Sequence, residues 1–183
     1  MASIKYRLLP LLLCALFLCA CNKTPDPTDA PEGCLRAGND AVDYTFCYAD
    51  DWLLDRNDGM IAIKYNVGGG KTIAYASISV QVFTLADSGA GANNYWEQYR
   101  KDLENLYGDQ IEFASEKMET KLGGVIANRN QYTLKLSDVS YTFEQVLCVR
   151  GGVVYIVTLT APEGSYDTVL PCFETVISTF EFT

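Results

Sequence analysis

The sequence predicts a single α+β domain, in which a mainly antiparallel sheet of about six to seven strands is flanked by helices. Two observations indicate this class. Runs of alternating apolar and polar residues, typical of half-buried strands, lie on both sides of a segment whose apolar residues follow a helical period. In the second half of the chain, two-residue turns separate the strand-like runs, and such turns join antiparallel neighbours. Blocks of strands separated by helices favour α+β over an alternating α/β fold.

Three strands are expected in the first half of the domain. Tyr44–Tyr48 alternates aromatic side chains on one face and is the first. Met60–Val67 follows an Asp-Gly turn, and Ile73–Leu85 is the third. The triple glycine Gly68–Gly70 lacks the first glycine of a phosphate-binding loop, because Tyr65 stands at that position. We therefore expect a flexible hairpin loop there.

A helix is expected after the Gly- and Ala-rich stretch Ala86–Asn94. Its apolar residues fall at steps of three and four, the spacing of one helical stripe: Trp96, Tyr99, Leu103 and Leu106. Gly108 follows this stripe and is expected to end the helix.

The second half is predicted as a four-strand meander followed by a helix. The four strands are Ile111–Thr120, Val125–Leu136, Tyr141–Arg150 and Val153–Thr160. The helix is expected from about Thr168, with Pro171 in its first turn. Its inward residues are expected to be Phe173, Val176, Ile177 and Phe180.

The N-terminus has the features of an export signal. Lys5 and Arg7 precede the apolar run Leu8–Ala20, which is too short to span a bilayer. The run ends in Leu-Cys-Ala-Cys21, which resembles the lipobox of bacterial lipoproteins, and that resemblance implies that Cys21 carries a diacylglyceryl (palmitate-type) anchor after cleavage. The alternative is an ordinary signal peptide cut at an Ala-x-Ala-like site.

This interpretation divides the chain into three parts and places it in the cell. Residues 1–20 are a lipoprotein signal peptide, residues 21–33 are a flexible Pro-rich tether, and residues 34–183 are the domain. The protein is expected in a bacterial cell envelope, held by the lipid on the outer side of the cytoplasmic membrane or in the outer membrane.

Charge and composition exclude several classes of function. The formal net charge is -9, which argues against nucleic acid as a partner. The chain contains no histidine, so serine triads and histidine-activated cysteine nucleophiles are excluded. Carboxylates are plentiful, but none stands out as a pair, so a hydrolase with two carboxylates is the weakest alternative. No cofactor and no catalytic residue is expected.

Four cysteines remain in the domain: Cys34, Cys47, Cys148 and Cys172. An even number outside the cytoplasm favours two disulfides, whose pairing the sequence leaves open among three possibilities. Free buried thiols are the next alternative. Zinc bound by four thiolates is the least favoured, because zinc ligands usually come in closely spaced pairs.

Two further groups of residues are candidate binding sites. Asp50, Asp51, Asp55 and Asp58 crowd one end of the first hairpin, and they are weak calcium candidates because a solvated turn explains them more simply. Tyr95 and Trp96, behind the Ala86–Asn94 loop, are the candidate exposed contact patch. Both residue types are enriched where proteins bind partners or sugars.

Several segments resemble the PsbP-like superfamily. Tyr44–Trp52 is similar to the opening strand of that family, although Ala49 stands where the family usually has proline. The Asp58-Gly59 and Gly123-Gly124 hairpins, the helix from Tyr95 and the ending Val176–Phe182 also match. The resemblance implies an α-β-α sandwich that is largely non-enzymatic and acts by binding partners or assisting assembly. It implies no metal-binding residue here.

The expected function is therefore that of a lipid-anchored envelope protein. Its non-catalytic domain would bind an envelope protein partner as an accessory or assembly factor. The alternative is a lipoprotein that binds a small ligand, a glycan or calcium.

Overall fold

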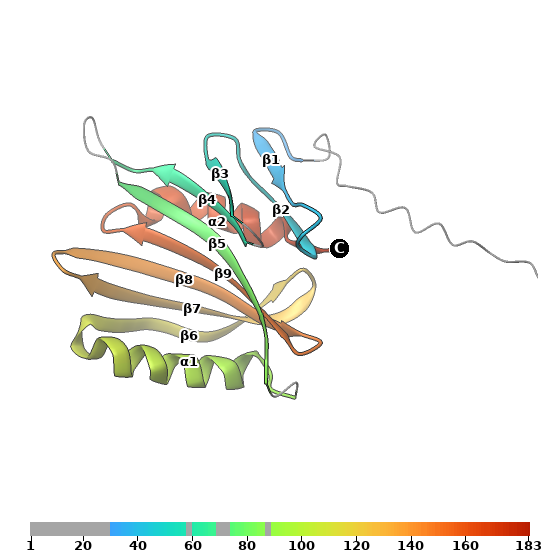
Figure 1. Ribbon diagram of the computed structural model, residues 1–183. Coiled ribbons are helices and arrows are strands. Elements are labelled where there is room, and N and C mark those ends of the chain that lie inside the picture. The colour runs from blue at the N-terminus through green and yellow to red at the C-terminus, as the bar shows by residue number, and fades with distance from the viewer. Residues whose placement is uncertain (1–29, 58–59, 69–73, 87–88) are drawn as a thin grey trace, which may run out of the picture.

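The computed structural model describes residues 30–57, 60–68, 74–86 and 89–183 (Figure 1). The predicted signal peptide, Cys21 and most of the predicted tether lie outside these residues. The elements in chain order are β1 (Cys34–Ala37), β2 (Tyr44–Ala49), β3 (Leu53–Asn57), β4 (Met60–Asn66), β5 (Tyr75–Thr84), α1 (Ala92–Tyr107), the 3-10 turn η2 (Gly108–Gln110), β6 (Ile111–Leu122), β7 (Val125–Leu136), β8 (Val139–Arg150), β9 (Val153–Pro162), α2 (Tyr166–Thr179) and β10 (Glu181–Phe182).

The main sheet has seven strands in the order β3-β4-β5-β9-β8-β7-β6, and every neighbouring pair is antiparallel. The four long strands β6 to β9 form the predicted meander. The three connections between these four strands are turns of only two residues, which join antiparallel neighbours. The pairing of β5 with β9 brings the first half of the chain to the last strand of the meander.

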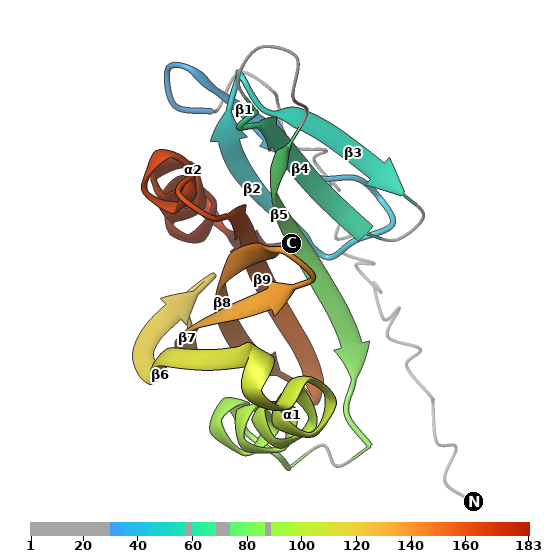
Figure 2. The ribbon, with the colours of Figure 1, turned by 90° about the vertical axis from the view of Figure 1, so that its left-hand side faces the viewer.

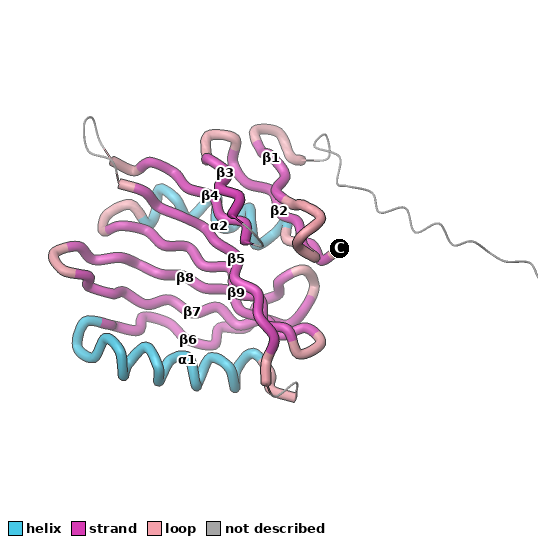
Figure 3. Tube along the Cα trace, in the orientation of Figure 1, coloured by secondary structure: helices cyan, strands magenta, loops and turns pink. Residues whose placement is uncertain are grey.

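The sheet lies between two covering layers, as Figures 1 and 2 show from two directions. The alternation of side chains along β9 defines the faces. Val157 and Leu159 pack in the main core with α2 and β2, whereas Val154 and Ile156 pack on the other side against residues of α1. The predicted α+β class and the α-β-α layering are therefore confirmed (Figure 3).

Three short strands, β1, β3 and β10, were not predicted. β1, β2 and β10 form a separate three-stranded sheet in that order, and β3 pairs with β4 at the edge of the main sheet. β1, β3 and β10 are five residues or shorter. Such short segments show no measurable period in the sequence, and they become strands only because a partner strand is already in place.

The two helices differ from expectation in detail. α1 begins at Ala92, inside the stretch predicted as a loop, and ends before Gly108 as predicted. The predicted apolar stripe stops at Leu103, because Leu106 is 72% exposed. α2 begins at Tyr166, two residues before the predicted start, so Pro171 lies inside the helix rather than in its first turn.

The C-terminus is fastened to the turn between β6 and β7. Phe180 stacks on Tyr44, with ring centroids 5.3 Å apart, and Phe182 meets Phe180 edge to face at the same distance. Gly123 has a φ of +54°, and a Cβ atom there would lie 2.6 Å from the Phe182 ring. Only glycine therefore satisfies both the backbone conformation and the close contact.

Gly123→Ala should lower the free energy of unfolding by about 2–4 kcal/mol, since it adds both left-handed strain and an overlap with Phe182. Gly124→Ala is the matched control. Gly124 has a φ of +79° but an open Cβ position, so it should cost only about 1–2 kcal/mol. Urea denaturation followed by circular dichroism measures both. Equal losses in the two variants would contradict the packing role of Gly123.

Candidate functional site

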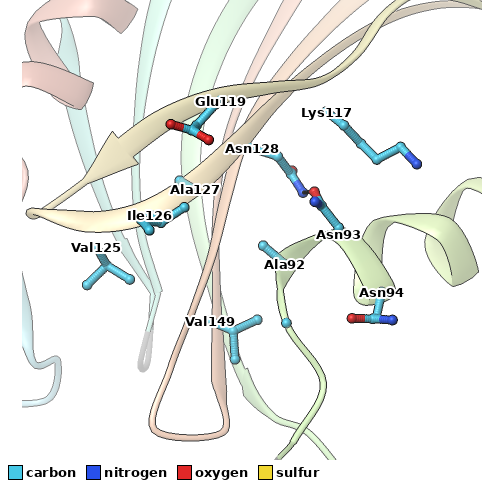
Figure 4. A pocket seen from close by; sticks show the side chains of 11 residues that line it. Ala92, Asn93, Asn94, Lys117, Glu119, Val125, Ile126, Ala127, Asn128 and Val149 are labelled. Atoms are coloured by element: carbon cyan, nitrogen blue, oxygen red, sulfur yellow. Dashed lines mark hydrogen bonds between the residues drawn. The ribbon is translucent and has the colours of Figure 1, made fainter.

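A pocket of about 510 Å³ lies between the start of α1 and the β6–β7 hairpin (Figure 4). Its apolar wall is formed by Val125 and Ile126 of β7 and by Val149 of β8. Ile126 is 70% exposed, which is unusual for so large an apolar side chain in a strand. The opposite wall is polar and comes from the first turn of α1, with Asn93 and Asn94.

A chain of asparagine side chains builds the polar wall. Asn128 donates its side-chain amide to Asn93 Oδ1 at 3.1 Å and accepts a hydrogen bond from the Asn130 amide at 2.7 Å. Asn130 in turn accepts from the main-chain N–H of Lys117 at 2.7 Å. Asn128 and Asn130 are almost completely buried. The chain therefore joins α1, β7 and β6 below the pocket.

The position of Lys117 explains why β6 needs this support. The register between β6 and β7 shifts twice, between Phe113 and Ser115 and between Ser115 and Met118. Lys117 lies in the second bulge with a φ of +53°, a conformation that non-glycine residues rarely adopt. The hydrogen bond to Asn130 satisfies the N–H that the bulge removes from the strand pairing. The Lys117 ammonium points to Glu97 of α1, 3.0 Å away.

The residue types around this pocket suit the binding of another molecule. The described lining consists of glycine, apolar residues, asparagines, Lys117 and Glu119. None of these is a hydroxyl or thiol nucleophile with a neighbouring base. An exposed apolar side chain surrounded by amide donors and acceptors is instead the composition of a protein contact site, in which the apolar group anchors and the amides orient the partner.

A buried charged cluster lies on the opposite face of the sheet. Glu144 of β8 is 4% exposed and accepts hydrogen bonds from Arg129 and from the Tyr166 hydroxyl. Arg129 also bonds Glu174 of α2 at 2.6 Å and lies over the Phe173 ring. The cluster thus ties the start and the middle of α2 to the sheet. We assign it a structural role, because each charge has its partner within the fold.

The predicted contact patch is half wrong. Trp96 is completely buried, where it donates to Glu116 at 3.0 Å and packs against Phe113 and Tyr132. The helix begins before Trp96, so this residue faces the sheet instead of extending a loop. Tyr95 is partly buried and stacks on Tyr99, with ring centroids 5.9 Å apart, and burial raises the pKa of Tyr95 to about 12.

The aspartates predicted as a weak calcium site are dispersed. Asp50 and Asp51 lie exposed in the turn after β2, whereas Asp55 is in β3 and is 3.8 Å from the Lys64 ammonium. Asp58 lies outside the described residues. Within residues 30–57, 60–68, 74–86 and 89–183, no group of three or more His, Cys, Asp or Glu side chains is arranged to hold a metal ion.

The cysteines do not show the predicted pairing. The described thiols of Cys34, Cys47, Cys148 and Cys172 are all free, so the expected disulfides find no support in the structure. Burial raises the pKa of Cys148 to about 12 and that of Cys172 to about 11. At neutral pH these two thiols are therefore protonated and unreactive.

Sequence reasoning missed the asparagines and Ile126. Asn93 and Asn128 are 35 positions apart, and no local pattern links them. The available signal was the pair Asn128 and Asn130 on the same strand, because two polar residues two positions apart lie on the same face. Such residues need buried partners if that face is covered.

Comparison with known proteins places the fold. No family model matches the chain, and no curated protein matches it. LpqN of Mycobacterium tuberculosis, a protein involved in cell envelope biogenesis, superposes with a TM-score of 0.59 and 16% identity over 76% of this chain and 83% of its own. The PsbP protein of the cyanobacterium Synechocystis superposes with a TM-score of 0.57 and 15% identity, over 91% of this chain and 99% of its own.

Two further structures match at similar levels. The Ran-binding protein Mog1p of Saccharomyces cerevisiae gives a TM-score of 0.55 and 12% identity, over 81% of this chain and 95% of its own. A Bacteroides thetaiotaomicron protein gives a TM-score of 0.51 and 14% identity, and this chain spans only 48% of its length. At these identities the likeness shows the fold alone: the chain has a PsbP-like fold, as its sequence predicts.

Asn130→Ala should lower the free energy of unfolding by about 1–3 kcal/mol, because the buried Asn128 amide and the Lys117 N–H lose their partner. Asn94→Ala changes an exposed asparagine of the same pocket and should change stability by less than about 0.5 kcal/mol. Chemical denaturation of both variants measures the difference. A neutral Asn130→Ala would show that the asparagine chain does not hold the pocket together.

Proposed function

We propose that the protein is a lipid-anchored, non-catalytic accessory factor of a bacterial envelope, and that it binds a protein partner at the pocket beside the start of α1. The observation that carries the proposal is Ile126, a 70% exposed isoleucine on a rigid strand, surrounded by side-chain amides. A rigid apolar anchor loses little conformational entropy on binding and stays available to an incoming chain.

The partner that fits this pocket is an extended segment of another protein. Its apolar side chain would cover Ile126 and Val149, and its main-chain amides would bond the side chains of Asn93 and Asn94. The lining includes one lysine and one glutamate, so it favours neither a positively nor a negatively charged partner segment. Two structural neighbours support such a role, since one is a Ran-binding protein and another is involved in cell envelope biogenesis.

The proposed anchor rests on the sequence before the domain. Basic residues, an apolar run of signal length, the lipobox-like ending at Cys21 and a proline-rich tether follow one another in the order of a lipoprotein precursor. None of the helices within the described part of the chain is long and apolar enough to cross a bilayer. The β1 strand begins at Cys34, so residues 21–33 would separate the lipid from the domain.

Cys21→Ala should abolish incorporation of labelled palmitate and move the protein from the membrane to the soluble fraction, because lipid is the proposed attachment. Cys19→Ala removes a cysteine two positions earlier and should leave lipidation intact. Metabolic labelling and membrane fractionation test both variants, and globomycin should make the unprocessed precursor of the natural chain accumulate. A Cys21→Ala protein that remains fully membrane-bound would contradict the anchor.

Ile126→Asp should abolish capture of the partner, because it places a charge where an apolar contact is proposed. Stability should change by less than about 0.5 kcal/mol, since the side chain is exposed. Leu106→Asp is the matched control, because Leu106 is 72% exposed on α1 outside the pocket.

The measurement is cross-linking of the tagged, lipidated protein in cells, followed by quantitative mass spectrometry of the retained proteins. A partner retained by the natural chain and by Leu106→Asp, but lost from Ile126→Asp, supports the proposal. Equal retention by all three proteins would exclude the pocket as the docking site. Recovery of the protein alone would contradict a protein partner and favour the small-ligand alternative.

A further inference from the structure

The end of β6 is an open strand edge. β6 is the last strand of the seven-stranded sheet and pairs with β7 on one side only. Figure 2 shows the arrowhead of β6 at the margin of the molecule, between the levels of α2 and α1. After the bulge at Lys117, the five residues Met118–Leu122 continue in regular register with β7. An open edge of this kind is a template for pairing with another strand.

The register identifies which main-chain groups face outward. Leu122 and Val125 flank the two-residue turn, so they form a hydrogen-bonded pair. The pairs then alternate, and Glu119 and Lys121 fall in the non-hydrogen-bonded class. The N–H and C=O groups of these two residues therefore point away from β7. Within the described part of the chain, no hydrogen bond to another element occupies them.

Charge selects one way in which two such edges can meet. In an antiparallel pair of identical strands, outward-facing residues must oppose outward-facing residues. Glu119 opposite Glu119, or Lys121 opposite Lys121, would place like charges together, which is unfavourable. With Thr120 on the two-fold axis, each Glu119 opposes the other copy's Lys121. Both side chains are exposed, and neither has an ion-pair partner among the described residues.

We infer that a second copy of this chain pairs with β6 through Met118–Leu122, with Thr120 on the two-fold axis, and so joins two seven-stranded sheets into one. The pairing forms four main-chain hydrogen bonds and two Glu119–Lys121 ion pairs. On the face toward α2, it sets the 58% exposed Met118 against the other copy's Leu122. Glu119 also lines the proposed partner pocket, but the inference is argued from the free edge of β6 and does not rest on that function.

The edge is rigid but short, which determines the strength of association. Leu122 is completely buried, and the adjoining turn is held against Phe182 by Gly123, so the edge needs no ordering before it pairs. The bulge at Lys117 limits the regular segment to five residues. An interface of that length is small compared with those of permanent dimers. Association should therefore be reversible and depend on protein concentration.

Cross-linking of Thr120→Cys tests the register directly. In the inferred pairing, the two Thr120 residues oppose each other at the distance of a non-hydrogen-bonded pair, which suits a disulfide between the substituted side chains. Mild oxidation of the full chain should give a dimer on a non-reducing gel. Mass spectrometry should then find two copies of the peptide that contains position 120, joined by a disulfide at that position. Glu112→Cys, on an exposed position of the same strand, is the control and should not cross-link beyond the unsubstituted chain.

Charge reversal tests the pairing in solution. Glu119→Lys and Lys121→Glu should each weaken self-association about tenfold in sedimentation velocity, because each creates two like-charge pairs. The double variant should restore association, and an equal mixture of the two single variants should form heterodimers. Circular dichroism checks the fold. A monomer at every concentration together with no Thr120→Cys dimer, or single reversals without effect, would overturn the inference.

Discussion

The two-sided burial of the central strands is the constraint on which the rest of the structure depends. β8 and β9 carry apolar side chains on both faces: Leu147 and Ile156 on one, Val146 and Val157 on the other. A sheet of this kind is stable only if both faces are covered. α1 covers one face, whereas α2, with the small β1-β2-β10 sheet, covers the other. The three layers are therefore a consequence of the composition of two strands.

Because both faces of the sheet are covered, some polar side chains of its strands are buried and need hydrogen-bond partners within the domain. On the α1 side, the buried Asn128 and Asn130 reach the helix start and the bulge in β6. On the α2 side, Glu144 accepts hydrogen bonds from Arg129 and Tyr166. Both networks connect a helix to the sheet at a defined position, because a hydrogen bond tolerates less sliding than an apolar contact. They make the hairpin and helix ends rigid enough to present a surface.

The surfaces that remain open are those that neither helix covers. The proposed pocket lies where α1 begins and the β6–β7 hairpin passes it, so that Ile126 extends beyond the cover of the helix. The inferred pairing edge lies on the same hairpin, but along the strand rather than on its face. A single rigid hairpin, held at its turn by the C-terminal phenylalanines, thus carries both proposed contacts.

The sequence by itself determined the class, the meander and the approximate ends of both helices, because period and turn chemistry are local properties. It also indicated the PsbP-like fold through its aromatic strand and closing segment. Only the tertiary structure decided that Trp96 is buried, that Leu106 is exposed and that Asn93 meets Asn128. These outcomes depend on where α1 is set against the sheet, and that position follows from contacts between residues far apart in the chain. Burial of an individual side chain is a property of its neighbours in space, which no local pattern contains.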